Sequence, residues 1–378
     1  MVDLLVFVTV CLLRLGVPLL ILRFPLPAIV FALVLDAADQ TIFQTLTDID
    51  LTNYQSYDKA LDVYYLAIAY IATFRNWRNG TAILIAAALW YYRLVGVTLF
   101  ELTGWRPLLL IFPNTFEYYF IALAVIRLGW DDTRLTRRQL VGIAAGIWVF
   151  VKLPQEWWIH IAQLDVTDVV KADLLGVAVT DSWGTALSNR PLVTAAMGAV
   201  LVLLGGVAVA LWRRTPPQDH RLTFDADRLA SFDRRSRPID AVRPWREGLV
   251  EKIVLIALMS IIFGRVIPDS TASVLDVLVG VSVLVSSNAA VTQRLQRRGH
   301  SWESVGRSFL GNLFVNVWLL VAFGNLLSSD DDGSSGLGLA FFLFLLSLVI
   351  ALFDRYRPTR EPLTWEPGPP LGAVTTRP

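Results

Sequence analysis

Two aspartates and a glutamine lie on one face of an apolar stretch that we expect to form a membrane-spanning helix. Asp36, Asp39 and Gln40 fall within Ala28–Leu46, at spacings of three and four residues that place them side by side on a helix. A carboxylate in such a segment costs free energy unless it is protonated, paired with a cation or exposed to water. Ionisable residues here therefore indicate a binding or catalytic site.

Further polar residues of this kind occur in the first half of the sequence. Lys152, Glu156 and His160 recur every four residues, which predicts one shared helix face. Pro113 and Asn114 interrupt a predicted helix just before Glu117. We expect the second to sixth spans to line a polar cavity open toward the outside. The residues expected to bind a solute or ion are Asp36, Asp39, Gln40, Asp62, Arg93, Asn114, Glu117, Lys152, Glu156 and His160.

The charges embedded in these spans do not balance, because five carboxylates face three cations. They are Arg14, Asp36, Asp39, Asp62, Arg93, Glu117, Lys152 and Glu156. Some of the carboxylates must therefore be protonated, solvated or bound to a cation. Arg14 and Arg93 are the expected counterions of the two aspartates in the second span or of Glu117. Lys152 is expected to pair with Glu156 along its own helix.

The sequence contains no strong signature of a metal or cofactor site. Glu156 and His160 have a spacing that can ligate a metal, but this spacing is common in helices. His220 and His300 fall in predicted cytoplasmic loops, which excludes a three-histidine zinc site. Cys11 is the one cysteine, so a cysteine metal site and an intrachain disulfide are excluded as well. We expect no metal and no cofactor.

The elements that position these residues are predicted to be membrane helices. The chain has 378 residues, 55% hydrophobic and 17% charged, a composition typical of a polytopic helical membrane protein. We predict an all-α fold of about eleven transmembrane helices. Their predicted ranges are Leu4–Leu22, Ala28–Leu46, Asp58–Phe74, Thr81–Phe100, Leu108–Leu128, Leu140–Ala162, Pro191–Trp212, Leu249–Ile267, Ser273–Gln293, Phe309–Leu327 and Leu337–Phe353.

Basic residues mark alternate loops, which predicts the orientation of the chain. Arg75 and Arg78 follow the third span, and Arg213 and Arg214 follow the seventh, whereas the intervening loops are acidic or neutral. The positive-inside rule then places the N-terminus outside and the C-terminus in the cytoplasm. We expect a multi-pass protein of the cell membrane whose first helix is retained, because Met1-Val2-Asp3 lacks the basic region of a signal peptide.

The predicted spans fall into two groups. Residues 1–188 form a six-helix membrane module that carries the outward-facing polar site. Residues 189–356 form a five-helix supporting module, which contains an Arg-rich cytoplasmic loop at 213–246 between its first two spans. Residues 357–378 are rich in proline and glycine and are predicted to be a disordered cytoplasmic tail.

The first functional hypothesis is a cation- or proton-coupled transporter of a small polar or amphiphilic solute. Asp36, Asp39 and Glu117 would bind the coupling cation, because carboxylates are in excess at mid-depth. Arg93 and Lys152 would hold an anionic group of the solute. The sequence contains no Walker A motif, which argues against ATP-driven transport within this chain.

Two alternatives remain open. The second hypothesis is an integral membrane enzyme acting on a lipid or lipid-linked substrate at the outer face. Its candidate catalytic residues are Asp39 or Glu156 as general base, with His160 as the proton partner. The third hypothesis is a non-catalytic scaffold subunit whose charges are structural pairs. The expected partners are membrane lipids and the small solute or lipid-linked substrate, and no nucleic acid is expected.

Overall fold

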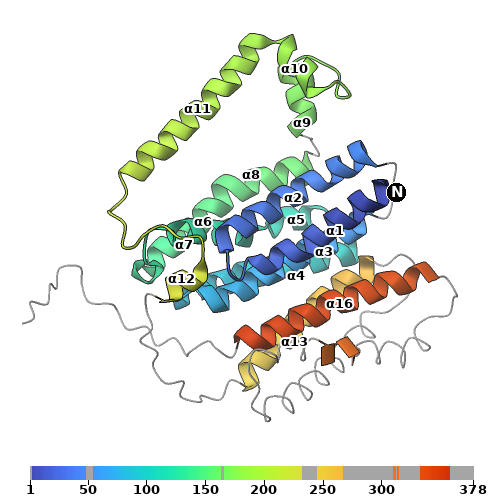
Figure 1. The fold of residues 1–378 in the computed structure, drawn as a ribbon, viewed down its shortest axis with the longest axis vertical. Coiled ribbons are helices and arrows are strands. Elements are labelled where there is room, and N and C mark those ends of the chain that lie inside the picture. The colour runs from blue at the N-terminus through green and yellow to red at the C-terminus, as the bar shows by residue number, and fades with distance from the viewer. Residues whose placement is uncertain are drawn as a thin grey trace, which may run out of the picture.

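The structure is a computed structural model that describes residues 2–47, 54–162, 166–231, 245–266, 310–311, 313–314 and 333–357. Every regular element in these ranges is a helix, which confirms the predicted all-α fold for this part of the chain (Figure 1). The first helices are α1 (Val2–Leu20), α2 (Pro25–Leu46), α3 (Tyr54–Asn76), α4 (Gly80–Thr103), α5 (Pro107–Ile111) and α6 (Thr115–Ile126). After the short turn η1 (Asp132–Arg134) come α7 (Arg137–Ile147), η2 (Trp148–Lys152), α8 (Leu153–Glu156) and η3 (Trp157–Ile161). The remaining ones are α9 (Val166–Val169), η4 (Val170–Leu174), α10 (Trp183–Asn189), α11 (Pro191–Arg213), α12 (Ala226–Ser231), α13 (Trp245–Val266) and α16 (Gly333–Tyr356).

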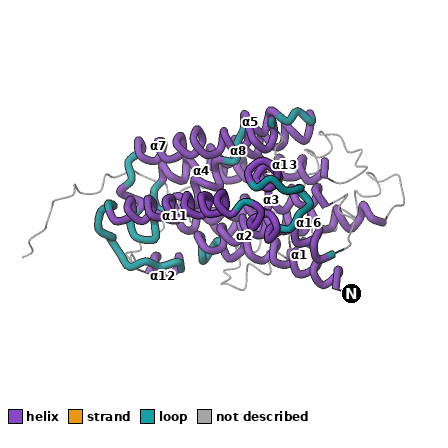
Figure 2. The backbone as a smooth tube through the Cα atoms, turned by 90° about the horizontal axis from the view of Figure 1, so that it is seen from above, coloured by secondary structure: helices purple, strands orange, loops and turns teal. Residues whose placement is uncertain are grey.

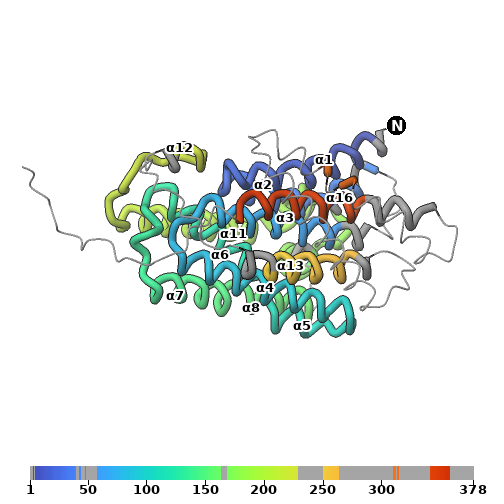
Figure 3. Tube along the Cα trace, turned by 90° about the horizontal axis from the view of Figure 1, so that it is seen from below, coloured from blue at the N-terminus to red at the C-terminus, as the bar shows by residue number. Residues whose placement is uncertain are grey.

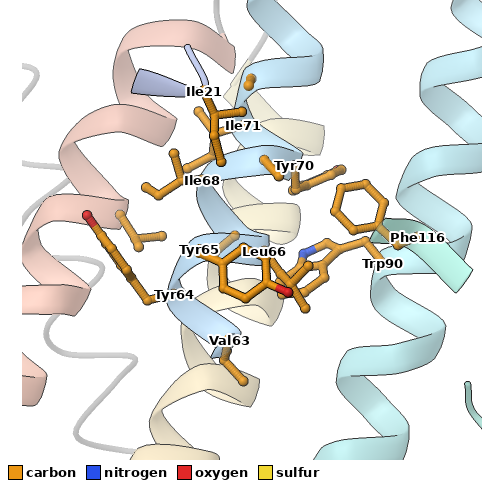
Figure 4. Close-up of a cluster of buried hydrophobic side chains, with 14 of the residues drawn as sticks. Ile21, Val63, Tyr64, Tyr65, Leu66, Ile68, Tyr70, Ile71, Trp90 and Phe116 are labelled. Atoms are coloured by element: carbon orange, nitrogen blue, oxygen red, sulfur yellow. The ribbon is translucent and has the colours of Figure 1, made fainter. Parts of the chain in front are cut away.

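Helix α3 lies at the centre of the bundle. It packs against α1, α2, α4, α6, α13 and α16, and its residues from Ala60 to Phe74 are buried apart from Asp62. In Figure 4 the side chains of Tyr64 and Tyr65 extend from α3 in different directions, and Trp90 and Phe116 lie next to each other beside it. Because α3 is enclosed over most of this stretch, the polar residues buried there must find partners within the protein.

The chain from α7 to η3 is one continuous helical run with two π-helical turns, η2 and η3. Pro154 lies between them. A proline inside a helix has no N–H to donate, and its ring clashes with the carbonyl group four residues before it. The widened turns on either side of Pro154 are consistent with this disruption, and π turns of this kind occur frequently at functional sites.

Three helical stretches of the described chain are long and apolar enough to cross a membrane. They are α4, the stretch Pro107–Ile126 that comprises α5 and α6, and α11. Helix α11 has no buried residue and stands apart from the bundle in Figure 1. Figure 2 shows the same helix from above, in front of the bundle. Its apolar surface is what a lipid-facing helix presents.

The helices fit most of the predicted ranges, with two ranges left untested. Ser273–Gln293 lies outside the described residues, as does all but four residues of Phe309–Leu327. The part of the arginine-rich loop from residue 232 to 244, the loop residues 48–53 and the tail from residue 358 also lie outside them. Helix α13 from the predicted supporting module packs directly against α3 and α4, and α16 from the same module packs against α3 (Figure 3).

The first part of the Arg-rich loop folds back over one end of the bundle. Asp219 accepts a hydrogen bond from Arg134 at 2.8 Å, and Asp225 pairs with Arg23 at 3.3 Å. Asp227 pairs with Arg75. Residues 215–231 therefore tie the α1–α2 turn, the end of α3 and the α6–α7 connection together, outside the polar site.

Candidate functional site

One arginine meets four aspartates where α1, α2 and α3 pack together. The Arg14 guanidinium forms ion pairs with Asp36 and Asp39 of α2 and with Asp58 and Asp62 of α3, the last at 2.7 Å. We call these five residues the aspartate cluster. The side chains of Arg14 and Asp39 are 4% and 2% exposed, whereas that of Asp62 is 38% exposed. The cluster is therefore sealed on one side and accessible on the other.

The helical spacing explains why the aspartates meet. Asp36 and Asp39 are three residues apart on α2, and Asp58 and Asp62 are four apart on α3, so each pair shares a helix face. A guanidinium presents five N–H donors in a planar fork, enough to serve several carboxylates at once. With all four aspartates ionised, the cluster has three negative charges in excess. The oxygens of Asp36, Asp58 and Asp62 lie within 4.8 Å of one another, close enough to share one bound cation.

The aspartate cluster contains three of the residues predicted for the site, namely Asp36, Asp39 and Asp62. Arg14 pairs with the two aspartates of α2, as expected from the sequence. The structure adds Asp58, which sequence reasoning had left out of the binding set. Its spacing of four residues from Asp62 is the sequence signal that could have identified it. The side chain of Gln40 lies outside the described residues.

A second charged cluster surrounds two glutamates, where α3, α4, α6 and the α7–η3 run meet. Its first member, Glu117, is 3% exposed and lies in the first turn of α6. The Tyr65 hydroxyl donates to Glu117 Oε1 at 2.5 Å, and Asn114 Nδ2 donates to Oε2 at 3.0 Å. Lys152 Nζ lies 3.8 Å from Oε2 and 4.0 Å from the centre of the Tyr118 ring.

The second member, Glu156, is held by groups from three elements. His160 Nε2 lies 3.0 Å from Oε2, and the backbone N–H of Asn114 donates to Oε1 at 3.1 Å. Arg93 NH1 is 4.0 Å from Oε1. Asn114 contacts both carboxylates, and thereby joins Glu117 to Glu156. We call Arg93, Asn114, Glu117, Lys152, Glu156 and His160, together with Tyr65, the glutamate cluster.

Two predicted pairings are wrong. Lys152 was expected to pair with Glu156 along its helix, but its ion pair is with Glu117 of α6. Lys152 ends η2 and Glu156 ends α8, with Pro154 between them, and the Glu156 oxygens are held by His160 and by the Asn114 N–H. Arg93 was expected to pair with an aspartate of α2 or with Glu117. Its guanidinium instead lies near Glu156 and donates to the carbonyl oxygen of Phe112 at 3.0 Å.

Helix α4 holds the break between α5 and α6 in place. Arg93 binds the Phe112 carbonyl, and Tyr92 donates to the Ile111 carbonyl at 2.7 Å. Gly96 lets the broken segment approach closely, because a Cβ atom there would lie 2.1 Å from the Phe112 Cβ. The carbonyl groups freed at Pro113 thus find partners inside the protein, which is the condition for irregular backbone at membrane depth.

A further charged network lies between α13, α16 and α3, where the sequence predicted a quieter, supporting role. Glu251 accepts hydrogen bonds from Tyr70 and from Arg357, the latter at 2.7 Å. Lys252 pairs with Asp354 at 2.8 Å. These residues fall close to the ends of α13 and α16, and no spacing in the sequence links them. They join the two predicted modules and lie outside both clusters.

Comparison with known proteins gives no match for this chain among protein-family models, curated proteins or solved structures.

Proposed function

We propose that this protein is a multi-pass helical protein of the cell membrane with about eleven spans, its N-terminus outside and its C-terminus in the cytoplasm. The length and apolar character of α4, of Pro107–Ile126 and of α11 support this proposal. The arginines in alternate loops support the orientation. In this arrangement the two charged clusters lie inside the helix bundle, toward its outer half.

Within this membrane protein, the function best supported is cation- or proton-coupled transport of a small polar or amphiphilic solute. The observation that carries it is the aspartate cluster, in which four carboxylates surround one guanidinium. Excess negative charge in a region of low dielectric constant favours the binding of a proton or another cation. Because Asp36, Asp58 and Asp62 are less buried than Asp39, a cation can reach them from solution.

The broken α5–α6 helix supplies a second element typical of transporters. Discontinuous helices occur at the binding sites of many secondary transporters, where their ends face the substrate and the ions. Here the break lies beside the glutamate cluster, and Asn114 connects it to Glu156. Movement of the break would therefore change the contacts of both glutamates.

The test is a flux measurement on the full chain in liposomes. Internal dyes report protons and sodium while amino acids, sugars, carboxylates and phosphate esters are added separately. We expect at least one class to drive cation entry, and we expect Asp36→Asn to abolish this entry. Asp225→Asn, which removes an aspartate paired with Arg23 outside the site, should leave it intact. Unchanged flux in Asp36→Asn, or no response to any class, would exclude the proposal.

A second candidate function is an enzyme acting on a lipid or lipid-linked substrate at the outer face. The observation that favours it is the 3.0 Å contact between His160 and Glu156, a pair able to accept and return a proton. A divalent cation shared by the three close aspartates would serve a phosphate-containing substrate. Mass spectrometry of a membrane lipid extract incubated with the protein tests this candidate. A lipid consumed by the wild type and by a folded His160→Ala variant alike would contradict the role of His160.

A further inference from the structure

Lys152 is a buried cation that meets one carboxylate and one aromatic ring among the residues that the structure describes. Its side chain is 4% exposed. Its one ion pair within the described residues is with Glu117 Oε2 at 3.8 Å, which is beyond hydrogen-bond distance. Its Nζ also lies over the face of the Tyr118 ring. An ammonium group has three donors, and burying it without acceptors is costly.

Glu117 occupies the place where a bound anion would be most stable. It lies in the first turn of α6, where unpaired backbone N–H groups and the helix dipole attract negative charge. Its oxygens accept hydrogen bonds from Tyr65 and Asn114, so it does not depend on Lys152 alone. The neighbouring Thr115 hydroxyl is also buried and has no hydrogen-bond partner in the described part of the chain. The Asn114 Oδ1 atom is likewise buried without a hydrogen-bond partner among the described residues, so Glu117 does not satisfy all the polar groups around it.

We infer that Lys152 and the N-terminal end of α6 form a binding site for a compact oxyanion, which is a carboxylate or a phosphate group of the solute. The Glu117 carboxylate occupies this site when no solute is bound and competes with the incoming anion for Lys152. This inference rests on the proposed transport function and names its substrate class. Arg93, which the sequence assigned to the same anion, is engaged by Phe112 and Glu156 instead.

Replacing the Glu117 carboxylate at Lys152 by the oxyanion of the solute requires the uptake of one proton. Glu117 takes up one proton from solution, its carboxylate becomes neutral, and the Lys152 ammonium exchanges Glu117 for the incoming anion. No other covalent bond forms or breaks. Anion binding should therefore be accompanied by the uptake of one proton. The charged and titratable groups that act on Glu117 from the helices packed around it are Asp36 of α2, Tyr65 of α3, Arg93 of α4 and Lys152 of η2.

The test is isothermal titration calorimetry on the full chain in lipid nanodiscs, with acetate and inorganic phosphate as separate probes. Titrations in buffers of different ionisation enthalpy count the protons taken up, after correction for those that the probe itself exchanges. We expect at least one probe to bind, with affinity falling about tenfold for each unit of pH increase while Glu117 is ionised. The probe that binds identifies the oxyanion.

Three variants separate the roles of the two residues. Lys152→Met should weaken binding at least tenfold, whereas Glu117→Gln should bind more tightly at neutral pH and take up no proton. Lys171→Met is the matched control, because Lys171 also lies over an aromatic ring, that of Trp183, and is outside the cluster. If Lys152→Met does not fold, the Glu117→Gln/Lys152→Met double variant removes both charges and should not bind.

Several results would overturn the inference. They are no binding of either probe to the wild type, wild-type affinity in a folded variant that lacks Lys152, and an unchanged proton count in Glu117→Gln. Asp36→Asn separates this inference from the proposed function. It should lose coupled flux and retain anion binding with a changed pH dependence, because Asp36 acts on the charge of Glu117 and forms no ion pair with Lys152 within the described residues. Unchanged flux in Asp36→Asn, with the expected anion binding, excludes only the coupling role of Asp36. Unchanged anion binding in the Lys152 and Glu117 variants, with the expected loss of flux in Asp36→Asn, excludes only the oxyanion site.

Discussion

The aspartate cluster and the glutamate cluster both lie inside the bundle, but they satisfy their charges in opposite ways. In the aspartate cluster a single guanidinium contacts four carboxylates, so negative charge is in excess. In the glutamate cluster two carboxylates face Lys152 and Arg93, with hydrogen bonds from Tyr65, Asn114 and His160. The first arrangement is suited to binding a cation, and the second to exchanging one anion for another.

The kind of cation in each cluster fits the role that we propose for it. A guanidinium keeps its proton in every protein environment and has donors enough for several carboxylates. Arg14 can therefore hold the four aspartates permanently. An ammonium is a compact charge on a flexible stem, and Lys152 contacts its carboxylate without a hydrogen bond. Such a contact is easily replaced.

The largest effect that we expect comes from removing the central cation of the aspartate cluster. Arg14→Met removes an ion pair from the buried Asp39 and from three further carboxylates at once. Breaking one buried ion pair costs about 3–5 kcal/mol, and here one substitution breaks four. We expect the variant to yield no monodisperse protein, as measured by fluorescence-detected size exclusion in detergent.

Arg14→Lys and Arg23→Met are the controls for this prediction. A lysine keeps the charge but not the planar fork, so it should restore only part of the yield. Arg23 lies at the surface and pairs with Asp225 at 3.3 Å, and its loss should change little. A normal yield of Arg14→Met would show that the fold tolerates the four aspartates without Arg14. The proposed difference in charge balance between the two clusters would then be wrong.

The second effect tests whether the glutamate cluster is balanced. Lys152→Met leaves the buried Glu117 without its ion pair, and we expect the free energy of unfolding to fall by about 3 kcal/mol. Adding Glu117→Gln to the same chain should recover most of the loss, because no uncompensated charge remains. Thermal unfolding of the two single variants and the double variant completes a double-mutant cycle. Additive effects would mean that the two residues do not interact.

The sequence predicted the helices and the polar faces, but not which charges meet. Asp36 with Asp39, and Asp58 with Asp62, follow from helical spacing alone. The partner of Lys152 does not, because Glu117 belongs to another helix and meets Lys152 only through the packing of α6 against the α7–η3 run. Arg93 could not be placed either, since its main partner is the Phe112 carbonyl. A backbone acceptor exposed by a helix break gives no signal in the residue types.

The extent of the membrane fold shows a similar limit. Composition and loop charges predict many spans, and the described chain contains three stretches that qualify by length and composition. Helix α3 is among the most buried elements, yet Asp58, Lys59 and Asp62 interrupt its apolar pattern. Its position at the centre depends on the six helices that pack around it. Hydropathy describes the residues of one segment and not the helices that pack around it, so it could not predict the central position of α3.

The third effect concerns the helix break between α5 and α6, which lies beside the glutamate cluster and has no counterpart in the aspartate cluster. A Cβ atom at Gly96 would lie 2.1 Å from the Phe112 Cβ, so Gly96→Ala must displace the broken segment. Overpacking of this kind costs about 1–3 kcal/mol. Gly198→Ala in α11 is the control, because no atom lies within 4 Å of its added Cβ. Thermal unfolding should show a loss in the first variant only, and equal stabilities would mean that α4 does not hold the break.

The smallest effect separates two adjacent tyrosines of α3 that point to different partners. The Tyr64 hydroxyl donates to the Leu15 carbonyl at 3.0 Å, and the Tyr65 hydroxyl donates to Glu117 at 2.5 Å. Hydrogen bonds between membrane helices are worth about 0.6 kcal/mol on average, so either substitution by phenylalanine should cost about this much stability. Only Tyr65→Phe should alter the glutamate cluster, because it removes a donor from the ionised form of Glu117. We therefore expect Tyr65→Phe to shift the pH dependence of anion binding in calorimetry while Tyr64→Phe leaves it unchanged. Identical pH profiles for both variants would show that the Tyr65 hydroxyl contributes packing and no control over the charge of Glu117.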